Sequence, residues 1–236
     1  MQNWQERTSM LLGQEALETL SLSRIAVVGT GGVGAVAAEM LVRAGVGHIA
    51  LIDSDSISES NLNRQIPALL STVGRMKCDV LRERFLDINP SLDITVIPEY
   101  VSEQNVAGIL GPYAPDVVVD AIDTLSPKIA LIQWCLGNGV RLVSSMGSGA
   151  KLDVTRIRIA DISATRMCPL AHMLRKRLHH LGISTGFTAV YSEEPPRRES
   201  VTLEESKNKK SQVGSVSYLP AAFGCACAQA ALGTLI

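Results

Sequence analysis

The sequence has few aromatic residues, no ordered cysteine spacing and no long apolar run. Aromatic residues make up 4% of the chain, although hydrophobic residues reach 46%. Five cysteines, an odd number without framework spacing, do not fit a disulfide-stapled extracellular module, so we expect a reducing cytoplasm. No apolar stretch reaches the roughly 18 residues that a membrane helix needs, and we expect no integral membrane segment.

Excess charge and a secretory signal are also missing. The formal net charge is −1, which gives no global attraction to nucleic acid. Residues 1–7 are polar and no apolar core follows them, so no signal peptide is predicted. At 236 residues the chain is long enough for one domain with a sizeable core.

Apolar runs alternate with helical patterns over the first 145 residues. Strands are predicted at 24–28, 48–52, 94–98, 117–120 and 141–144. Helices are predicted at 14–20, 33–44, 76–88, 103–110 and 128–137. This alternation predicts an α/β fold with a doubly wound, Rossmann-like, mainly parallel sheet.

The pattern changes after residue 145. Residues 151–159 alternate by twos, which predicts an exposed antiparallel strand. A basic helix is expected at 167–181 and another strand at 188–192. The polar stretch 193–212 is interpreted as a mobile loop that a partner could order. The last segment, 219–236, is rich in Ala, Gly and Cys and is typical of a buried helix.

A glycine motif, Gly29-Thr30-Gly31-Gly32-Val33-Gly34, lies between the first predicted strand and its helix. Gly29 permits a tight turn, Gly31 permits close approach of a phosphate, and Gly34 permits close packing of helix on strand. Free N–H groups and the helix dipole favour an anion there. Such turns also occur in folds that bind nothing, but the strand before and the helix after favour a nucleotide site.

A second motif follows the next strand. Asp53 ends that strand, where a carboxylate is expected to bind ribose hydroxyls. The run Ser60-Asn61-Leu62-Asn63-Arg64-Gln65 comes within a dozen residues. A redox fold would not require a guanidinium here, so Arg64 indicates that phosphates are transferred or displaced.

Two more charged residues extend the candidate site. Lys77 stands near the start of a predicted helix, where a cation is poorly placed for the helix dipole and a bound anion would explain it. Asp123 follows the strand at 117–120, near the carboxyl edge where open α/β sheets bind ligands. Asp120 is interpreted as structural.

Taken together, these motifs resemble the ThiF/MoeB/HesA family of adenylating enzymes, relatives of the ubiquitin-activating enzymes. An NAD-linked oxidoreductase would share the glycines and Asp53, but it would have no reason to carry Arg64, Lys77 and Asp123. The segments that carry the resemblance are 29–34, 43–47, 53–55, 60–65, 74–77, 88–90 and 120–123.

The resemblance implies an ATP- and Mg²⁺-dependent ligase that adenylates a carboxylate. Asp53 would hold the ribose, Asp123 the magnesium ion, and Arg7 would reach across a homodimer interface to the phosphates. The expected catalytic set is Arg64, Lys77, Asp123 and Arg7. The expected nucleotide-binding set is Gly29, Gly31, Gly32, Gly34, Asp53, Asp55, Asn61, Arg64, Gln65 and Lys77. Several alternatives stay open: Arg64 as a surface charge, Arg7 as a solvated one, and Asp55 as a cap.

The domain expectation follows from these assignments. We expect one ThiF-type domain over 1–236, with a helical arm at 1–22, a nucleotide-binding core at 23–146 and a C-terminal antiparallel extension at 147–236. The extension would include the mobile loop at 193–213. Two C-x-x-C pairs, which hold zinc in some relatives, are missing, so no structural zinc is expected. Cys225 and Cys227 are interpreted as core packing, and Cys168 as structural.

The second half resembles one branch of the family, the tRNA threonylcarbamoyladenosine dehydratases. The segments concerned are 146–155, 161–162, 168–170, 190–193 and 214–220. This resemblance implies that the carboxylate of threonylcarbamoyladenosine in tRNA is adenylated and the neighbouring carbamoyl group then closes a ring. The nearest alternative is adenylation of the C-terminal Gly-Gly of a ubiquitin-like sulfur carrier. A nicotinamide-dependent oxidoreductase and a non-catalytic binding relic are weaker alternatives.

The composition of one stretch also favours an RNA partner. Between Ile162 and Ser192 there is no Asp or Glu, so this stretch could neutralise phosphates. The candidate nucleic-acid contacts are Arg166, Arg175, Lys176 and Arg177. The alternative is a solvated helix face balanced by acidic surface elsewhere, and a sulfur-relay protein partner also stays open.

Overall fold

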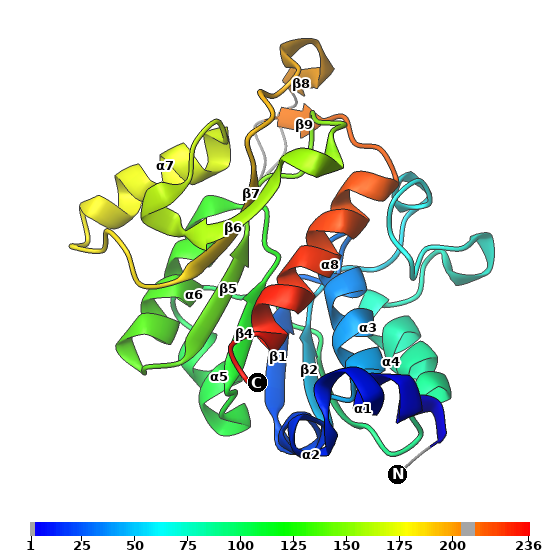
Figure 1. Cartoon of the computed structure of the whole chain (residues 1–236). Coiled ribbons are helices and arrows are strands. Elements are labelled where there is room, and N and C mark those ends of the chain that lie inside the picture. The colour runs from blue at the N-terminus through cyan, green and yellow to red at the C-terminus, as the bar shows by residue number, and fades with distance from the viewer. Residues whose placement is uncertain (1–2, 204–210) are drawn as a thin grey trace.

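The computed structural model describes residues 3–203 and 211–236. Its centre is a seven-stranded sheet in the order β3-β2-β1-β4-β5-β7-β6 (Figure 1). All neighbouring pairs are parallel except β6 with β7. The strands are β1 Arg24–Val28, β2 His48–Ile52, β3 Asp93–Ile97, β4 Val117–Asp120, β5 Arg141–Ser145, β6 Ile157–Asp161 and β7 Thr188–Ser192. The predicted α/β, mainly parallel sheet with an antiparallel extension is confirmed.

Helices cover both faces of the sheet, and the inner strands are apolar for that reason. In β1, Ile25 and Val27 face the core formed with α3, α4 and α8, whereas Ala26 and Val28 face the core formed with α5, α6 and α7. The helices are α1 Glu6–Leu12, α2 Gln14–Leu22, α3 Gly34–Ala44, α4 Lys77–Ile88, α5 Val106–Tyr113, α6 Leu125–Gly137, α7 Pro169–His179 and α8 Tyr218–Leu232. None of these described helices is both long and apolar enough to cross a bilayer.

The C-terminal helix α8 packs closely on α3, the helix that follows the glycine turn (Figure 1). Gly224 permits this approach, because a Cβ there would lie 2.6 Å from the Val33 carbonyl oxygen. The predicted buried C-terminal helix is therefore present. Its first turn places Pro220 beside Gly32, so α8 also forms one wall of the glycine turn.

The predicted strand at 151–159 is wrong in its first half. Residues 151–153 form a loop, 154–156 form a short 3₁₀ turn, and β6 begins only at Ile157. The Glu194 carboxylate accepts hydrogen bonds from the backbone N–H groups of Leu152 and Asp153. These side-chain bonds occupy backbone N–H groups that a strand ladder would need.

Two further expectations are modified. The predicted loop at 193–212 contains an antiparallel hairpin of β8 Val201–Leu203 with β9 Ser211–Val213, and residues 204–210 lie outside the described part. The predicted arm is two helices, α1 and α2, separated by Gly13 at φ 86°. These helices lie at the end of the molecule opposite the β8–β9 hairpin (Figure 1).

Candidate nucleotide site

The glycine turn lies at the carboxyl end of β1, and two of its glycines are fixed by backbone contacts. A Cβ on Gly34 would lie 1.8 Å from the Gly29 carbonyl oxygen, and one on Gly29 would lie 2.9 Å from the Ala121 oxygen. Gly29 also has φ 87°, a conformation that favours glycine. These two positions therefore exclude any side chain for reasons of folding.

Gly31 differs from these two glycines. A Cβ there would meet only the Gln65 amide, at 3.5 Å, which is ordinary contact. The fold has room for a side chain at this position, so packing does not explain its absence. Close approach of a ligand to the backbone would explain it. Gly32 is tighter, since its Cβ would lie 3.0 Å from Pro220 Cβ and 3.1 Å from the Arg64 carbonyl oxygen.

Asp53 connects the second motif to the glycine turn. Its Oδ2 accepts hydrogen bonds from the Thr30 backbone N–H at 2.7 Å and from the Thr30 hydroxyl at 3.0 Å. Its Oδ1 accepts one from the Asp55 N–H at 2.9 Å. The carboxylate is thus held at the end of β2, half-buried, and Oδ1, which accepts one hydrogen bond, keeps a second lone pair for a ligand hydroxyl.

Lys77 is the first residue of α4 and is 5% exposed. Its ammonium Nζ lies 2.7 Å from Oδ2 of Asp55, whose side chain is 66% exposed. The question left open for Asp55 is therefore answered in part: it pairs with Lys77. The backbone N–H of Asp55 also donates to Asp53, which links this pair to the carboxylate that holds Thr30 of the glycine turn.

The 58–65 loop carries Arg64 and Asn61. Asn61 is buried, and its Oδ1 accepts a hydrogen bond from the Ser58 N–H, which caps the turn. Arg64 donates through Nη1 to the Ser60 carbonyl and to Asn63 Oδ1, both at 2.8 Å. Within the described residues no partner is seen for its other nitrogens, which leaves one edge of the guanidinium for an anion.

Gln65 carries an orphaned polar atom. Its Oε1 is buried and has no hydrogen-bond partner in the described part of the chain. The amide lies over Gly31, where backbone is accessible for lack of a side chain. A buried carbonyl oxygen without a partner is costly, and the nitrogen of the same amide, Nε2, lies 3.5 Å from where a Cβ on Gly31 would be, so the amide borders the space that a nucleotide would fill. The residues present therefore fit a bound nucleotide.

Asp120 and Asp123 have different surroundings. Asp120 is fully buried and its Oδ2 accepts from Lys128 Nζ at 2.6 Å and from the Ser144 hydroxyl at 2.7 Å. Its other oxygen accepts from the Ile122 N–H, so Asp120 is structural, as predicted, and shapes the loop that bears Asp123. Asp123 is exposed at the carboxyl edge.

The described residues contain no group of three or more His, Cys, Asp or Glu side chains that could hold a metal by themselves. Mg²⁺ commonly takes one or two carboxylates together with substrate phosphates. Asp123 therefore fits a magnesium ion that arrives with a nucleotide.

Arg7 is not brought to this site within one chain. It is exposed on α1, and the neighbouring Gln5 side chain packs over Gly45, which ends α3 at the amino edge of the sheet. The glycine turn lies at the carboxyl edge, at the other end of α3. Contact between Arg7 and phosphates would need a second copy of the chain, and its role stays a prediction.

Two residues of the site were missed in the sequence. Thr30 anchors Asp53, and Cys78 lies with Sγ 3.8 Å from the Thr30 hydroxyl and 3.7 Å from the Asp53 carbonyl. Burial raises the pKa of Cys78 to about 12, so the thiol is protonated at neutral pH. The sequence signal for Thr30 was its place inside the glycine motif, and that for Cys78 was its position directly after Lys77.

The remaining cysteines divide between core and surface. Cys227 is buried, as predicted, and burial raises its pKa to about 12. Cys225 is exposed, so its assignment to the core is wrong; it stands one residue off the face of α8 that packs on α3. Cys168 is buried.

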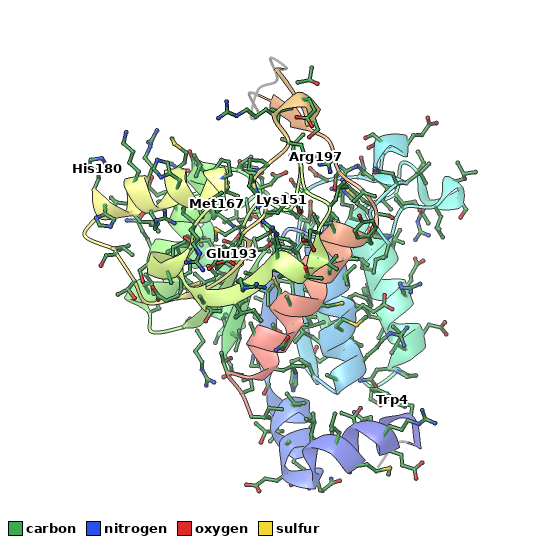
Figure 2. The ribbon with its side chains drawn as sticks, turned by 45° about the horizontal axis from the view of Figure 1, so that its top comes forward. Trp4, Lys151, Met167, His180, Glu193 and Arg197 are labelled. Carbon is green, nitrogen blue, oxygen red and sulfur yellow. The ribbon has the colours of Figure 1, made fainter. Side chains whose placement is uncertain are left out.

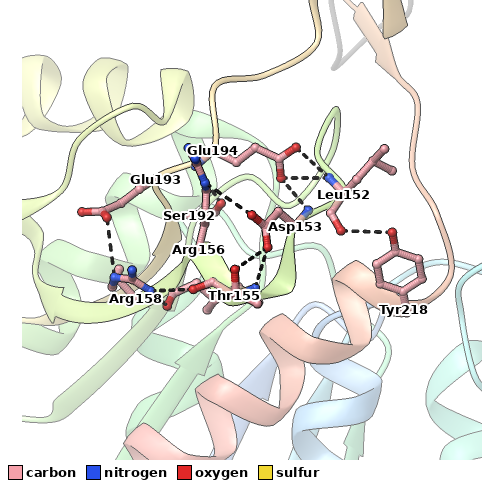
Figure 3. A network of polar contacts seen from close by, with 10 residues as sticks. Leu152, Asp153, Thr155, Arg156, Arg158, Ser192, Glu193, Glu194 and Tyr218 are labelled. Atoms are coloured by element: carbon pink, nitrogen blue, oxygen red, sulfur yellow. Dashed lines mark hydrogen bonds and ion pairs between the residues drawn. The ribbon is translucent and has the colours of Figure 1, made fainter.

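A polar network holds the segment beyond β5 (Figure 3). The Glu194 carboxylate accepts from the backbone N–H groups of Leu152 and Asp153, and the Tyr218 hydroxyl donates to the Leu152 carbonyl at 3.0 Å. Lys151 is 3% exposed and donates to the Ser192 carbonyl, which assigns it to packing. Burial lowers the pKa of Lys151. Asn63 Nδ2 donates to the Ser215 carbonyl, so the 58–65 loop and this extension are joined.

Comparison with known proteins settles the family. A sequence model of the ThiF family matches residues 5–236, nearly the whole chain.

The chain belongs to the ThiF family. A relative in this family is the tRNA threonylcarbamoyladenosine dehydratase of Bacillus subtilis, which is 40% identical over 226 residues, covering 92% of this chain and 89% of that protein. The Escherichia coli protein of the same name is 43% identical over 178 residues, 74% of this chain and 66% of that one. A yeast relative, tRNA threonylcarbamoyladenosine dehydratase 2, is 36% identical, and the match spans 47% of its length.

Solved ThiF-family structures agree. The E. coli tRNA N6-threonylcarbamoyladenosine dehydratase TcdA in complex with ATP matches with a TM-score of 0.90 and 36% identity, covering 100% of this chain and 96% of that one. Its complex with AMP gives a TM-score of 0.89. The adenylyltransferase and sulfurtransferase UBA4 of Lodderomyces elongisporus is 33% identical over 65% of this chain, a likeness at the level of the family.

Proposed function

We propose that this ThiF-family enzyme is a tRNA threonylcarbamoyladenosine dehydratase. The observation that carries the proposal is likeness along the whole chain, at a TM-score of 0.90, to a dehydratase of that name solved with ATP. The likeness includes residues 147–236, beyond the nucleotide core, whereas the sulfurtransferase relative matches 65% of the chain. Adenylation of a sulfur-carrier protein is therefore supported only at the level of the family.

The first chemical step is adenylation. An oxygen of the threonylcarbamoyl carboxylate attacks the α-phosphorus of ATP, and the bond to the pyrophosphate oxygen breaks. Negative charge develops on the phosphates, so the enzyme accelerates this step by positioning the reactants and compensating charge. Arg64 and Lys77 would supply that compensation, and the N–H groups of the glycine turn would cradle the anion. Magnesium, held by Asp123 and the phosphates, would add positive charge.

The second step is ring closure. The carbamoyl group of the same modified adenosine attacks the activated carbonyl carbon and loses one proton. The bond from that carbon to the bridging oxygen breaks, and AMP leaves with this former carboxylate oxygen. The product nucleoside has lost one water, which ATP has taken up in becoming AMP and pyrophosphate. Because this attack is intramolecular, no protein nucleophile is needed. Raised pKa values at Cys78 and Cys227 agree with that, since neither thiol is ionised at neutral pH.

The proposal includes a homodimer and a cytoplasmic location. Arg7 lies at the amino edge of its own sheet, so a role at the phosphates requires a partner subunit. Modified tRNA as a substrate implies the cytoplasm.

The decisive experiment supplies purified protein with ATP, Mg²⁺ and tRNA that bears threonylcarbamoyladenosine, and then weighs the digested nucleosides. We expect loss of one water from that nucleoside, with one AMP per turnover. AMP release that instead requires a Gly-Gly-ended carrier protein would establish the sulfur-carrier alternative.

A further inference from the structure

Helix α7 has one apolar face and one cationic face. Ala171, Leu174 and Leu178, spaced by three and four residues, are buried against the sheet. The other side of the helix is exposed and carries no acidic residue. Its exposed basic side chains are His172, Lys176, Arg177, His179 and His180. We call this exposed side the α7 face.

The structure divides the four arginines and lysines of the stretch into two kinds. Arg166 pairs with Glu193 at 2.5 Å, and Arg175 donates to both the carbonyl and the hydroxyl of Thr165. These two cations already have partners within the chain. Lys176 and Arg177 are exposed and have no hydrogen bond or ion pair to any residue of 3–203 or 211–236.

The α7 face begins beside the carboxyl edge of the sheet. Cys168, just before α7, and Leu170 in its first turn lie 3.8 Å and 3.7 Å from where a Cβ on Gly147 would be, and Gly147 follows the end of β5. From there the helix runs outward to His180, as Figure 2 shows. Its 11 residues span roughly 16 Å, the length of two or three nucleotides.

We propose that the α7 face, centred on Lys176 and Arg177, binds the phosphate backbone of the RNA whose modified nucleotide enters the site. This inference rests on the proposed function. A nucleotide that reacts at the carboxyl edge brings flanking phosphates with it, and α7 starts at that edge. The stretch from 162 to 192 carries cations and no acidic residue, so it suits a polyanion even though the whole chain has a net charge of −1.

Cations in the last turn also stabilise a helix through its dipole. The test must therefore separate binding from stability. The test variant is Lys176→Ala/Arg177→Ala. The control variant is Arg82→Ala, which removes an exposed cation from α4 on the other face of the sheet and leaves Arg43 and Arg84 paired with Glu39.

Binding of labelled tRNA is measured by anisotropy at several salt concentrations, together with nucleoside conversion and thermal melting. For the test variant we expect a Kd about tenfold higher, a salt slope shallower by about 1.4, and a KM for tRNA raised with kcat unchanged. Both variants should melt within about 4 °C of wild type. The control should keep the wild-type salt slope.

A wild-type salt slope in the test variant would overturn the inference. So would competition by polyglutamate as strong as by RNA of equal charge, since the α7 face would then suit an acidic protein. The test variant could bind tRNA more weakly while the wild type converts no nucleoside. That result would support RNA binding by the α7 face and refute the proposed dehydratase activity.

Discussion

The ammonium group of Lys77 is buried and lies 2.7 Å from the carboxylate of Asp55, which projects into solvent. The two side chains differ in burial. That of Lys77 is 6% exposed and stays inside the fold, whereas that of Asp55 is 66% exposed and can turn away into solvent. A nucleotide phosphate could therefore replace Asp55 as the partner of Lys77. Without either partner, Lys77 would be a buried charge, which is strongly unfavourable.

This relationship predicts that Asp55→Ala destabilises the free protein more than the nucleotide-bound one. We expect the melting temperature without ATP to fall by about 2–8 °C, corresponding to about 1–2 kcal/mol for a chain of this size. ATP should restore most of that loss, because phosphate then neutralises Lys77. Calorimetry with and without ATP measures both. An equal loss in the two conditions would show that Asp55 is not exchanged for ligand.

Removal of Arg64 should abolish adenylation without harming the fold. Arg64 makes only loop contacts through Nη1, and we assign its remaining edge to the phosphates. Arg64→Ala should lower ATP–pyrophosphate exchange about 10²–10³-fold, as loss of one charge-stabilising donor commonly does. Arg64→Lys should restore little of the exchange activity, since an ammonium group cannot make the planar, bidentate contact of a guanidinium. Exchange within tenfold of wild type for Arg64→Ala would remove this residue from the catalytic set.

Two glycines of the same turn should respond differently to alanine. At Gly31 the new methyl would meet only the Gln65 amide, so Gly31→Ala should fold, with a melting temperature within about 3 °C of wild type, and lose ATP affinity about tenfold or more. At Gly34 it would lie 1.8 Å from the Gly29 oxygen, and Gly34→Ala should lose about 3 kcal/mol or fail to fold. Isothermal titration and urea unfolding distinguish the two. Unchanged ATP affinity in Gly31→Ala would mean that no ligand approaches this backbone.

Acid stability should depend on Asp161. Partial burial alone would raise the pKa of this carboxyl, but hydrogen bonds from Ser163 and from the Gly186 N–H lower it to about 2. A lowered pKa stabilises the fold above the unfolded value near 4, and this contribution disappears as pH falls towards 2. Urea unfolding should show Asp161→Asn to be less stable by about 1–2 kcal/mol at pH 6. The difference should shrink at pH 2. A constant difference across that range would refute the linkage.

Most of the sheet could be predicted because its strands are buried on both faces and read as short Val, Ile and Leu runs. The strands at 24–28, 48–52 and 117–120 were placed at their observed bounds. The 151–159 segment failed because contacts with Glu194, 41 residues or more away, decide its backbone. Alternation along a sequence cannot report such partners.

The sequence indicated candidate site residues but not the contacts among them. The motifs indicated Asp53 and Lys77 because strand ends and helix starts can be located from the sequence, and Arg64 because of its place in the 60–65 run. The pairing of Lys77 with Asp55, and the orphaned oxygen of Gln65, depend on side-chain positions that only the folded chain defines. The cations at 166 and 175–177 looked equivalent in the sequence, and only the structure shows that Arg166 and Arg175 have partners whereas Lys176 and Arg177 have none among the described residues.

The central claim is tested most directly by the mass of the modified nucleoside. Wild-type protein, ATP, Mg²⁺ and tRNA bearing threonylcarbamoyladenosine should yield a nucleoside lighter by one water, with AMP formed in equal amount, and Arg64→Ala should yield none. A nucleoside of unchanged mass with active, folded protein and intact substrate would contradict the account.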